Sequence, residues 1–319
     1  MAELPAKSIA PFPSKMTYRI GVDAGGTKTE CILIDEAGAI VARHLAPGCN
    51  PSIVGPAQAR DLLAEALHAI RFQATQRDPH SVISHTHVYA AGSRAFWRET
   101  AAALTGFGLI FTADDSYPIL ELATRGGPGL VLHGGTGSFV AARGPDHAIH
   151  YAGGIGWRFG DAGSGYDLGR RVVARALLEL QGWAETSALA AIVREHTGLG
   201  QAADAAVVTR YFYTHPDPNQ RIASLAPIVL QLAATADPVA QEIVAASCGE
   251  LVALARTVAA RLFPPAAPAT LVAGLSGPML SHPAAQAALA AASPFPLQPV
   301  EGTPIEGVRR LLARAQEPG

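Results

Sequence analysis

Cysteine, lysine and long apolar runs are scarce in this 319-residue sequence, and each shortage excludes a class of protein. Its cysteines are Cys31, Cys49 and Cys248. An odd, widely spaced set of this kind argues against a disulfide framework and against a Cys-x-x-Cys metal site. No apolar run approaches the roughly 18 residues of a membrane span. We therefore expect a reduced cytoplasmic protein with no membrane partner.

Charge is also sparse, because charged residues make up 16% of the chain and the formal net charge is −2. A balance this close to neutral predicts no nucleic-acid partner. Hydrophobic residues reach 49%, which is enough for a sizeable core and too much for a disordered chain. Residues 1–16 are rich in proline and lack the apolar stretch of a signal peptide, so we expect a flexible tail there. The length favours roughly two domains.

Glycine is abundant, and its first informative group follows a short apolar run that ends on Asp23. Gly25, Gly26 and Thr27 come next, before a second apolar run. Short apolar runs on either side of glycines predict a strand, a tight turn and a strand. Successive N–H groups in such a turn bind anions, and the neighbouring acid and hydroxyl suit a metal-bound polyphosphate. The P-loop pattern is absent, and an ordinary hairpin turn is the alternative for this motif alone.

The same pattern returns between residues 130 and 142, where Gly134, Gly135, Thr136 and Gly137 separate two apolar runs. Two such units, each opening a segment of about domain size, predict a duplicated fold with two phosphate loops facing one cleft. Strands and helices alternate along the rest of the chain, which makes the fold class α/β. Apolar residues at helical spacing predict one long helix from Pro56 to Arg77. A helical block is expected between residues 185 and 261, with segments at 186–197, 201–213, 219–235 and 238–262, and it would serve as scaffold or dimer surface.

Three further polar residues lie where ligands are often bound. Asn50 is at the tip of a loop rich in proline and glycine, where it is either a turn residue or an amide offered to a ligand. Asp115 follows a short strand, a position that α/β proteins use for catalytic acids and that helix N-caps also occupy. Asp161 lies in the glycine-rich stretch 152–166, which is expected to hold no regular element and whose backbone can pass close to a ligand.

As a set, these motifs resemble the BadF/BadG/BcrA/BcrD ATPase family of the actin/hexokinase/Hsp70-type ATPase superfamily. The resemblance extends from Tyr18 over nearly the whole chain. It is narrowest to the branch of eukaryotic-type N-acetylglucosamine kinases and bacterial glucosamine kinases. It implies two actin-like (ribonuclease H-like) domains around a nucleotide cleft, the second enlarged by helices. The implied boundaries are a tail at 1–16, an N-terminal domain at 17–115, a C-terminal domain at 116–300, and a closing helix at 301–319 that returns to the first domain.

The resemblance also implies ATP and Mg²⁺ as cofactors and assigns roles to the site residues. Asp115 is similar to the catalytic acid of the family, and Asp23 would hold Mg²⁺ through water. The other implied assignments are phosphate binding by Gly25, Gly26, Thr27, Lys28, Gly135, Thr136 and Gly137; adenosine binding by Gly274 and Ser276; and sugar binding by Asn50, Gly153, Gly154 and Asp161.

The implied function is transfer of the γ-phosphate of ATP to a hydroxyl of N-acetylglucosamine or glucosamine, by a homodimer. Ala162 departs from the family pattern, which usually has Glu there, so an iron–sulfur-free ATPase or a sugar-binding module without kinase activity is the alternative. Related activators of radical dehydratases hold an iron–sulfur cluster on cysteines, and this chain lacks a plausible cysteine pair. Sugar-sensing repressors of similar fold need a DNA-binding helix-turn-helix, for which residues 1–16 are too short.

Overall fold

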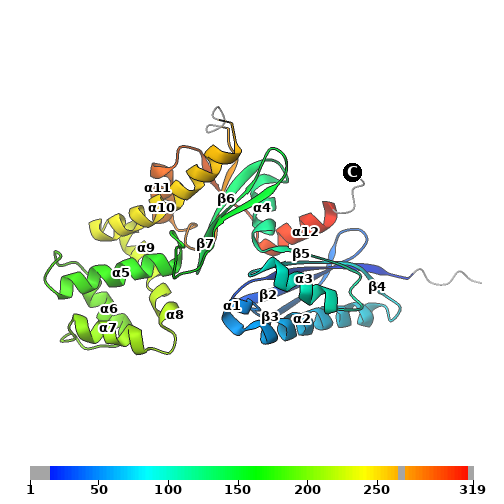
Figure 1. The fold of residues 1–319 in the computed structure, drawn as a ribbon, viewed down its shortest axis with the longest axis horizontal. Coiled ribbons are helices and arrows are strands. Elements are labelled where there is room, and N and C mark those ends of the chain that lie inside the picture. Colours follow the sequence, from blue (N-terminus) through cyan, green and yellow to red (C-terminus); the bar gives the residue numbers. More distant parts are fainter. Residues whose placement is uncertain (1–14, 265–269, 315–319) are drawn as a thin grey trace, which may run out of the picture. The chain divides into compact units, whose positions relative to one another are not determined.

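The computed structural model describes residues 15–264 and 270–314, so the expected tail lies almost wholly outside the described residues. The chain divides into two compact units. The first comprises the chain up to Pro118 and from Gly302 onward, and the second is Ile119–Glu301. Each unit is built on one five-stranded sheet with helices packed against it (Figure 1).

The sheet of the first unit has the strand order β3-β2-β1-β4-β5. Strands β1, β2 and β3 form an antiparallel meander, and β4 and β5 run parallel to β1. The strands are β1 (Thr17–Ala24), β2 (Lys28–Ile34), β3 (Ile40–Pro47), β4 (Val82–Ala90) and β5 (Leu109–Asp114). The helices are α1 (Pro51–Val54), α2 (Pro56–Arg77), α3 (Arg94–Ala103) and α12 (Pro304–Arg314).

The two faces of this sheet carry different cores, because successive side chains of a strand point to opposite faces. Ile20 and Leu33 lie on the face covered by α2, whereas Ile32 and Ile34 lie on the face covered by α12. At Gly21 of β1 a Cβ atom would come within 2.5 Å of Val308 Cγ1 on α12. A glycine at this position therefore lets α12 pack directly on the central strand.

The second unit repeats the topology of the first, with the strand order β10-β9-β6-β7-β8. Here β6, β7 and β8 form the antiparallel meander, and β9 and β10 run parallel to β6. The strands are β6 (Gly129–Gly134), β7 (Ser138–Arg143), β8 (Ile149–Gly153), β9 (Ala273–Ser276) and β10 (Leu297–Pro299). The helices are α4 (Ser116–Thr124, which begins in the first unit), α5 (Gly165–Leu180), α6 (Leu189–Thr197), α7 (Ala205–Thr214), α8 (Pro218–Ala223), α9 (Ala226–Ala234), α10 (Pro238–Leu262) and α11 (Pro283–Ala292).

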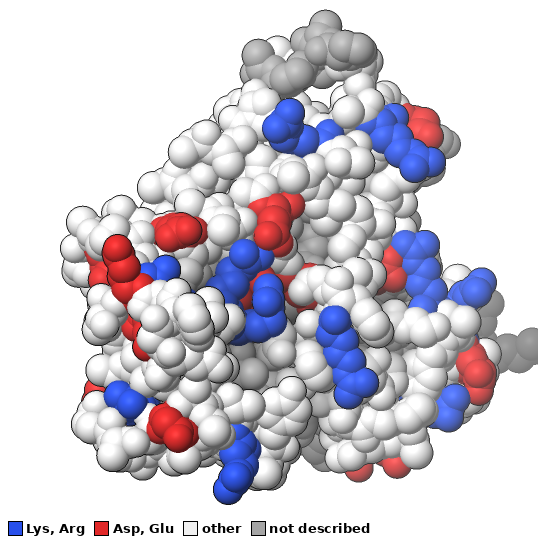
Figure 2. Space-filling model, turned by 60° about the vertical axis from the view of Figure 1, so that its left-hand side comes forward, with Lys and Arg blue, Asp and Glu red and all other residues white. Residues whose placement is uncertain are grey.

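Helix α4 covers one face of the second sheet, and the other face supports the large helical core that includes α5 and α10. By length and composition alone α10 could cross a membrane, with a mean hydropathy of 1.6 over its most apolar 18 residues. One such helix is weak evidence, and α10 contributes Ile243, Val244 and Leu251 to the core. On the face seen in Figure 2, acidic and basic side chains are interspersed, in keeping with the small net charge.

The expected α/β class and the two repeated strand–glycine–strand units are confirmed. Two expectations were wrong in detail. The stretch 219–235, expected as one helix, is split into α8 and α9, because Pro227 has no N–H to continue the ladder. The stretch beginning at Ala152 was expected to hold no regular element, yet Ala152 and Gly153 complete strand β8.

Candidate active site

Asp23 and Asp115 lie at the carboxyl ends of parallel strands of the first sheet. Strands β1, β4 and β5 are parallel, and their register aligns Asp23 with Tyr89 and Tyr89 with Ala113. Asp115 follows directly after the end of β5. Burial raises the pKa of Asp23 to about 7, and the negative charge of Asp115 adds to this effect. The two carboxyl groups therefore interact electrostatically in a partly desolvated environment.

The adjacent acids Asp114 and Asp115 have different environments. Arg94, the first residue of α3, donates from Nε to both carboxylate oxygens of Asp114, at 3.0 and 2.8 Å. Asp115 has no cationic partner among the described residues, and burial together with the charge of Asp114 raises its pKa to about 6. Asp115 is thus the uncompensated carboxyl of the pair and the one able to accept a proton.

The first glycine turn is closed by a hydrogen bond from Gly25 N to the carbonyl of Lys28, at 2.9 Å. Thr27 and Lys28 are exposed at the turn. The Lys28 ammonium pairs with Glu30 at 3.1 Å, with more than half of the lysine side chain exposed. Exposed ion pairs of this kind contribute little stability, so Lys28 can exchange Glu30 for another anion.

The loop that carries Asn50 lies against this turn. A Cβ atom at Gly48 would come within 2.3 Å of the Gly26 carbonyl oxygen, so the two backbones are in direct contact. Asn50 is the N-cap of α1, and its Oδ1 accepts from Ser52 N at 2.9 Å. The capping bond uses the amide oxygen and leaves the Nδ2 hydrogens of Asn50 as donors.

The second glycine turn is held from three directions within the second unit. Gly135 N donates to the carbonyl of Gly137 at 2.8 Å, which closes the turn. Gly165 N, at the start of α5, donates to the carbonyl of Gly135 at 2.8 Å. Gly277 has φ +90°, and a Cβ there would lie 2.3 Å from the Gly134 carbonyl oxygen. Thr136 is left exposed at the tip of a fixed turn.

The two residues assigned to adenosine differ in their surroundings. A Cβ atom at Gly274 would come within 2.7 Å of both Ala123 and Val300, so packing alone explains this glycine. Ser276 Oγ lies 3.3 Å from His133 Nδ1. The backbone that approaches the second turn belongs to Gly277. An adenosine role for Gly274 and Ser276 stays a prediction.

The glycine-rich stretch brings Asp161 beside the second turn. Asp161 has φ +68°, and its Oδ1 accepts from Gly156 N at 3.3 Å. Its other oxygen lies 3.0 Å from the position that a Cβ of Gly137 would occupy. Burial raises the pKa of Asp161, and no cation pairs with it among the described residues. This carboxyl group is available to hydrogen-bond a polar ligand.

Gly153 and Gly154 both have positive φ, at 75° and 60°. A Cβ atom at Gly154 would lie 2.2 Å from Tyr151 Oη, so a side chain there would displace the exposed Tyr151 ring. Ala162 presents a methyl group where its relatives were expected to have a carboxylate, and its carbonyl accepts from Ser138 Oγ at 2.7 Å.

The structure therefore groups the predicted residues unit by unit. Asp23, Asp115 and the first turn belong to the first unit, as does Asn50. The second turn, Asp161, Gly153 and Gly154 belong to the second unit.

The sequence did not predict Arg94, which pairs with Asp114 and leaves Asp115 without a cation. It also did not predict Ser247 and Asp167, which support the loop that carries Asp161. The only local sequence signal for Arg94 is its place just after Ser93, a residue type common at helix starts.

Comparison with known proteins adds an independent finding. The sequence model of the BadF/BadG/BcrA/BcrD ATPase family matches residues 20–274. An N-acetyl-D-glucosamine kinase from Dictyostelium discoideum is 24% identical over 255 residues, which cover 76% of this chain and 79% of that protein.

Solved structures resemble the chain over most of its length. A Chromobacterium violaceum protein, provisionally assigned as an N-acetylglucosamine kinase, is 26% identical with a TM-score of 0.73, and the match covers 94% of this chain and 100% of that one. A Porphyromonas gingivalis protein with the same provisional assignment is 20% identical with a TM-score of 0.69, over 91% and 97% of the two chains. At 20% identity, the Porphyromonas gingivalis structure supports the fold alone.

Proposed function

Because this chain belongs to the BadF/BadG/BcrA/BcrD ATPase family, we propose that it is an ATP-dependent kinase of an amino sugar. The acceptor would be N-acetylglucosamine or glucosamine, as the names of its relatives suggest. The observation that best supports this proposal is the uncompensated carboxyl of Asp115 beside Asp23 and the first glycine turn. A phosphoryl-transfer site needs such a base close to an anion-binding turn.

In the proposed reaction Asp115 accepts the proton of the attacking sugar hydroxyl. The hydroxyl oxygen forms a bond to the γ-phosphorus, the bond from that phosphorus to the β–γ bridging oxygen breaks, and ADP leaves. A general base works best when its pKa is near the working pH, and burial brings the pKa of Asp115 to about 6. Asp114 cannot serve as well, because Arg94 holds it as a charged pair.

We propose that the two glycine turns hold the phosphates of ATP through their N–H groups and through Thr27, Lys28 and Thr136. Asp23 suits Mg²⁺, because its partly buried carboxyl lacks a compensating cation apart from the exposed Lys28. Mg²⁺ keeps several waters, so Asp23 would hold it through water. When bound, the ion would neutralise charge on the phosphates.

The sugar hydroxyls would be bound by the Nδ2 of Asn50, the Asp161 carboxylate and the backbone of Gly153 and Gly154. Gly274 and Ser276 would flank the adenosine. We also propose that the protein is cytoplasmic and forms a homodimer. Light scattering of the purified protein would test the dimer.

A coupled ADP-release screen tests the function. Purified protein with ATP and Mg²⁺ would be offered glucosamine, N-acetylglucosamine, mannosamine and glucose, each in turn. We expect ADP release with one of the amino sugars, well above the release with glucose or without sugar. Equal release in all samples would indicate an ATPase with no sugar acceptor, and the kinase proposal would fail.

The second candidate is a sugar-binding module without kinase activity, which the methyl group of Ala162 favours. Isothermal titration of the same sugars separates the two candidates. Amino-sugar binding without any ADP release would identify the module.

A further inference from the structure

The loop that carries Asp161 has a backbone shape that needs support. Asp161 is in the left-handed region at φ +68°, and Gly163 follows at φ +83°. Residues with a side chain rarely adopt this region, and they remain there only when the surrounding structure holds them. The hydrogen bonds of the neighbouring backbone show what holds this loop.

Three separate elements bind the backbone just after Asp161. Ser138 of β7 donates its hydroxyl to the carbonyl of Ala162 at 2.7 Å. Gly165 N donates to the carbonyl of Gly135 in the second glycine turn. Gly163 N donates to Ser247 Oγ at 3.0 Å, although Ser247 is 84 positions further along the chain. Helix α10 therefore fixes the middle of the loop.

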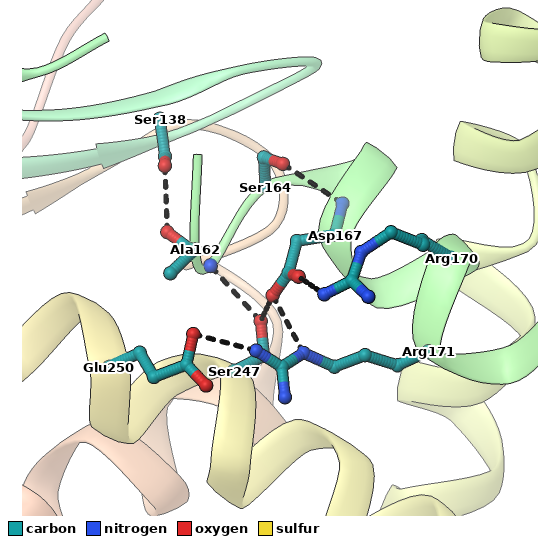
Figure 3. Close-up of polar contacts among 9 residues, drawn as sticks. Ser138, Ala162, Ser164, Asp167, Arg170, Arg171, Ser247 and Glu250 are labelled. Atoms are coloured by element: carbon teal, nitrogen blue, oxygen red, sulfur yellow. Dashed lines mark hydrogen bonds and ion pairs between the residues drawn. The ribbon is translucent and has the colours of Figure 1, made fainter. Parts of the chain in front are cut away.

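Ser247 is a buried hydroxyl inside the apolar helix α10. A serine in a helix commonly bonds to the carbonyl one turn back. Ser247 instead donates to Asp167 Oδ2 at 2.7 Å while it accepts from Gly163 N (Figure 3). Thr257 on the same helix shows the ordinary arrangement, with Oγ1 donating to the Ala253 carbonyl at 3.0 Å.

Asp167 anchors this hydroxyl from the first turn of α5. Its carboxylate accepts from Arg170 at 2.8 Å and from Arg171 Nε at 2.9 Å, and Arg171 also pairs with Glu250 (Figure 3). Burial works to raise the pKa of Asp167, but the hydrogen bonds from Ser247 and the two arginines outweigh it, so the pKa is lowered. The carboxylate stays charged and fixes the direction of the Ser247 hydroxyl.

We propose that Ser247 and Asp167 are positioning residues for the sugar acceptor, acting through the Gly163 amide on the carboxylate of Asp161. They would not touch the sugar themselves. The inference rests on the proposed kinase function, in which Asp161 binds sugar hydroxyls. It adds that the affinity for the sugar, more than the affinity for ATP, depends on a hydroxyl located in the scaffold helix.

The first test is Ser247→Ala, with Thr257→Ala as the matched control on the same helix. Ser247→Ala leaves Gly163 N without its acceptor, while Asp167 keeps both arginines. We expect the KM for the amino sugar to rise about tenfold, the effect of losing one hydrogen bond, and the KM for ATP to change much less, because Gly165 N still donates to the Gly135 carbonyl. Thr257→Ala should change neither KM. Unchanged sugar KM in Ser247→Ala with a lower melting temperature would mean a structural role only and would overturn the inference.

A second readout does not depend on catalysis. Hydrogen exchange of peptides covering residues 155–168 should be faster in Ser247→Ala than in wild type, and unchanged in Thr257→Ala. Unchanged exchange in Ser247→Ala would overturn the inference. If wild type phosphorylates no sugar in the screen, the kinase proposal fails instead, and the exchange result alone decides whether Ser247 holds the loop.

Discussion

At the scale of single residues, identical side chains acquire different chemistry from their partners. Asp114 and Asp115 are neighbours, yet only Asp114 has a guanidinium against it. The sequence pattern placed an acid after a strand, and such an acid is as often a helix cap as a base. The deciding contact comes from Arg94, which lies 20 positions before Asp114 and whose only local signal is the preceding Ser93.

Asp115→Asn and Asp114→Asn should therefore behave differently. Asparagine cannot accept the sugar proton, so Asp115→Asn should fold normally and lose at least about 100-fold in kcat. Asp114→Asn removes an ion pair whose arginine is largely exposed, so it should cost at most about 1 kcal/mol of stability. Its loss of kcat should be much smaller than that of Asp115→Asn. Steady-state kinetics and urea unfolding of both variants check this. Near-wild-type kcat in Asp115→Asn would remove its assignment as the base.

At the scale of elements, each glycine turn is packed against the backbone of a second loop. Gly48 contacts Gly26 in the first unit, and Gly277 contacts Gly134 in the second. Both contacts leave no space for a Cβ atom, so the turn and the neighbouring loop can approach only through glycine. Because both units show this arrangement, we infer that the contact holds each glycine turn in place and is not a peculiarity of one loop.

Gly277→Ala should disturb the second turn. Its φ of +90° and the clash of a Cβ with the Gly134 carbonyl predict a loss of roughly 1–3 kcal/mol and a higher KM for ATP. Gly249→Ala in α10 is the control, because no atom beyond its chain neighbours and the adjacent helix backbone lies within 4 Å of its Cβ position. A glycine-to-alanine change inside a helix should stabilise by roughly 0.5–1 kcal/mol. Urea unfolding should thus move in opposite directions for the two variants, and a Gly277→Ala protein as stable as wild type would refute the packing argument.

Elements with strong local signals were predicted closely, and those without them were not. Helix α2 has the bounds expected from Pro56 and its apolar periodicity. Strand β3 is an edge strand with alternating exposure, and it was not anticipated. Strand β8 is also at an edge and ends in glycine, which hides it in the glycine-rich stretch. Strands β3 and β8 bury few side chains, so their composition resembles that of loops.

At the scale of the whole molecule, the sequence was sufficient to predict a duplication but not the contacts that make each unit a site. Two similar glycine motifs predicted two similar units. The two sheets do have the same strand order, with β6, β7, β8, β9 and β10 in the places of β1, β2, β3, β4 and β5. Ser247 could not be recognised in this way, because its partners Gly163 and Asp167 are about 80 positions away. Its helix shows only an apolar pattern, into which a small serine fits without any visible signal.

The paired acids should also make the stability of the whole molecule depend on pH when no metal is bound. The folded chain raises the pKa of Asp23 to about 7, through burial and the charge of Asp115, from about 3.9 in the unfolded chain. A raised pKa in the folded state adds stability that is complete below the unfolded pKa and is lost as pH rises through the folded pKa. Wild type in EDTA should therefore lose stability between pH 5 and pH 8, relative to Asp23→Asn, whose amide does not titrate.

Urea unfolding of wild type and Asp23→Asn at pH 5 and pH 8 measures this change. Asp167→Asn provides a control of opposite sign, because hydrogen bonds lower the pKa of Asp167 and its contribution is lost only at pH values below about 4. The difference between wild type and Asp167→Asn should stay constant from pH 5 to pH 8, while the difference for Asp23→Asn should move in favour of the variant. A constant difference for both variants would show that the Asp23 carboxyl is hydrated and already charged, and Asp23 would then lose the electrostatic argument for binding a cation.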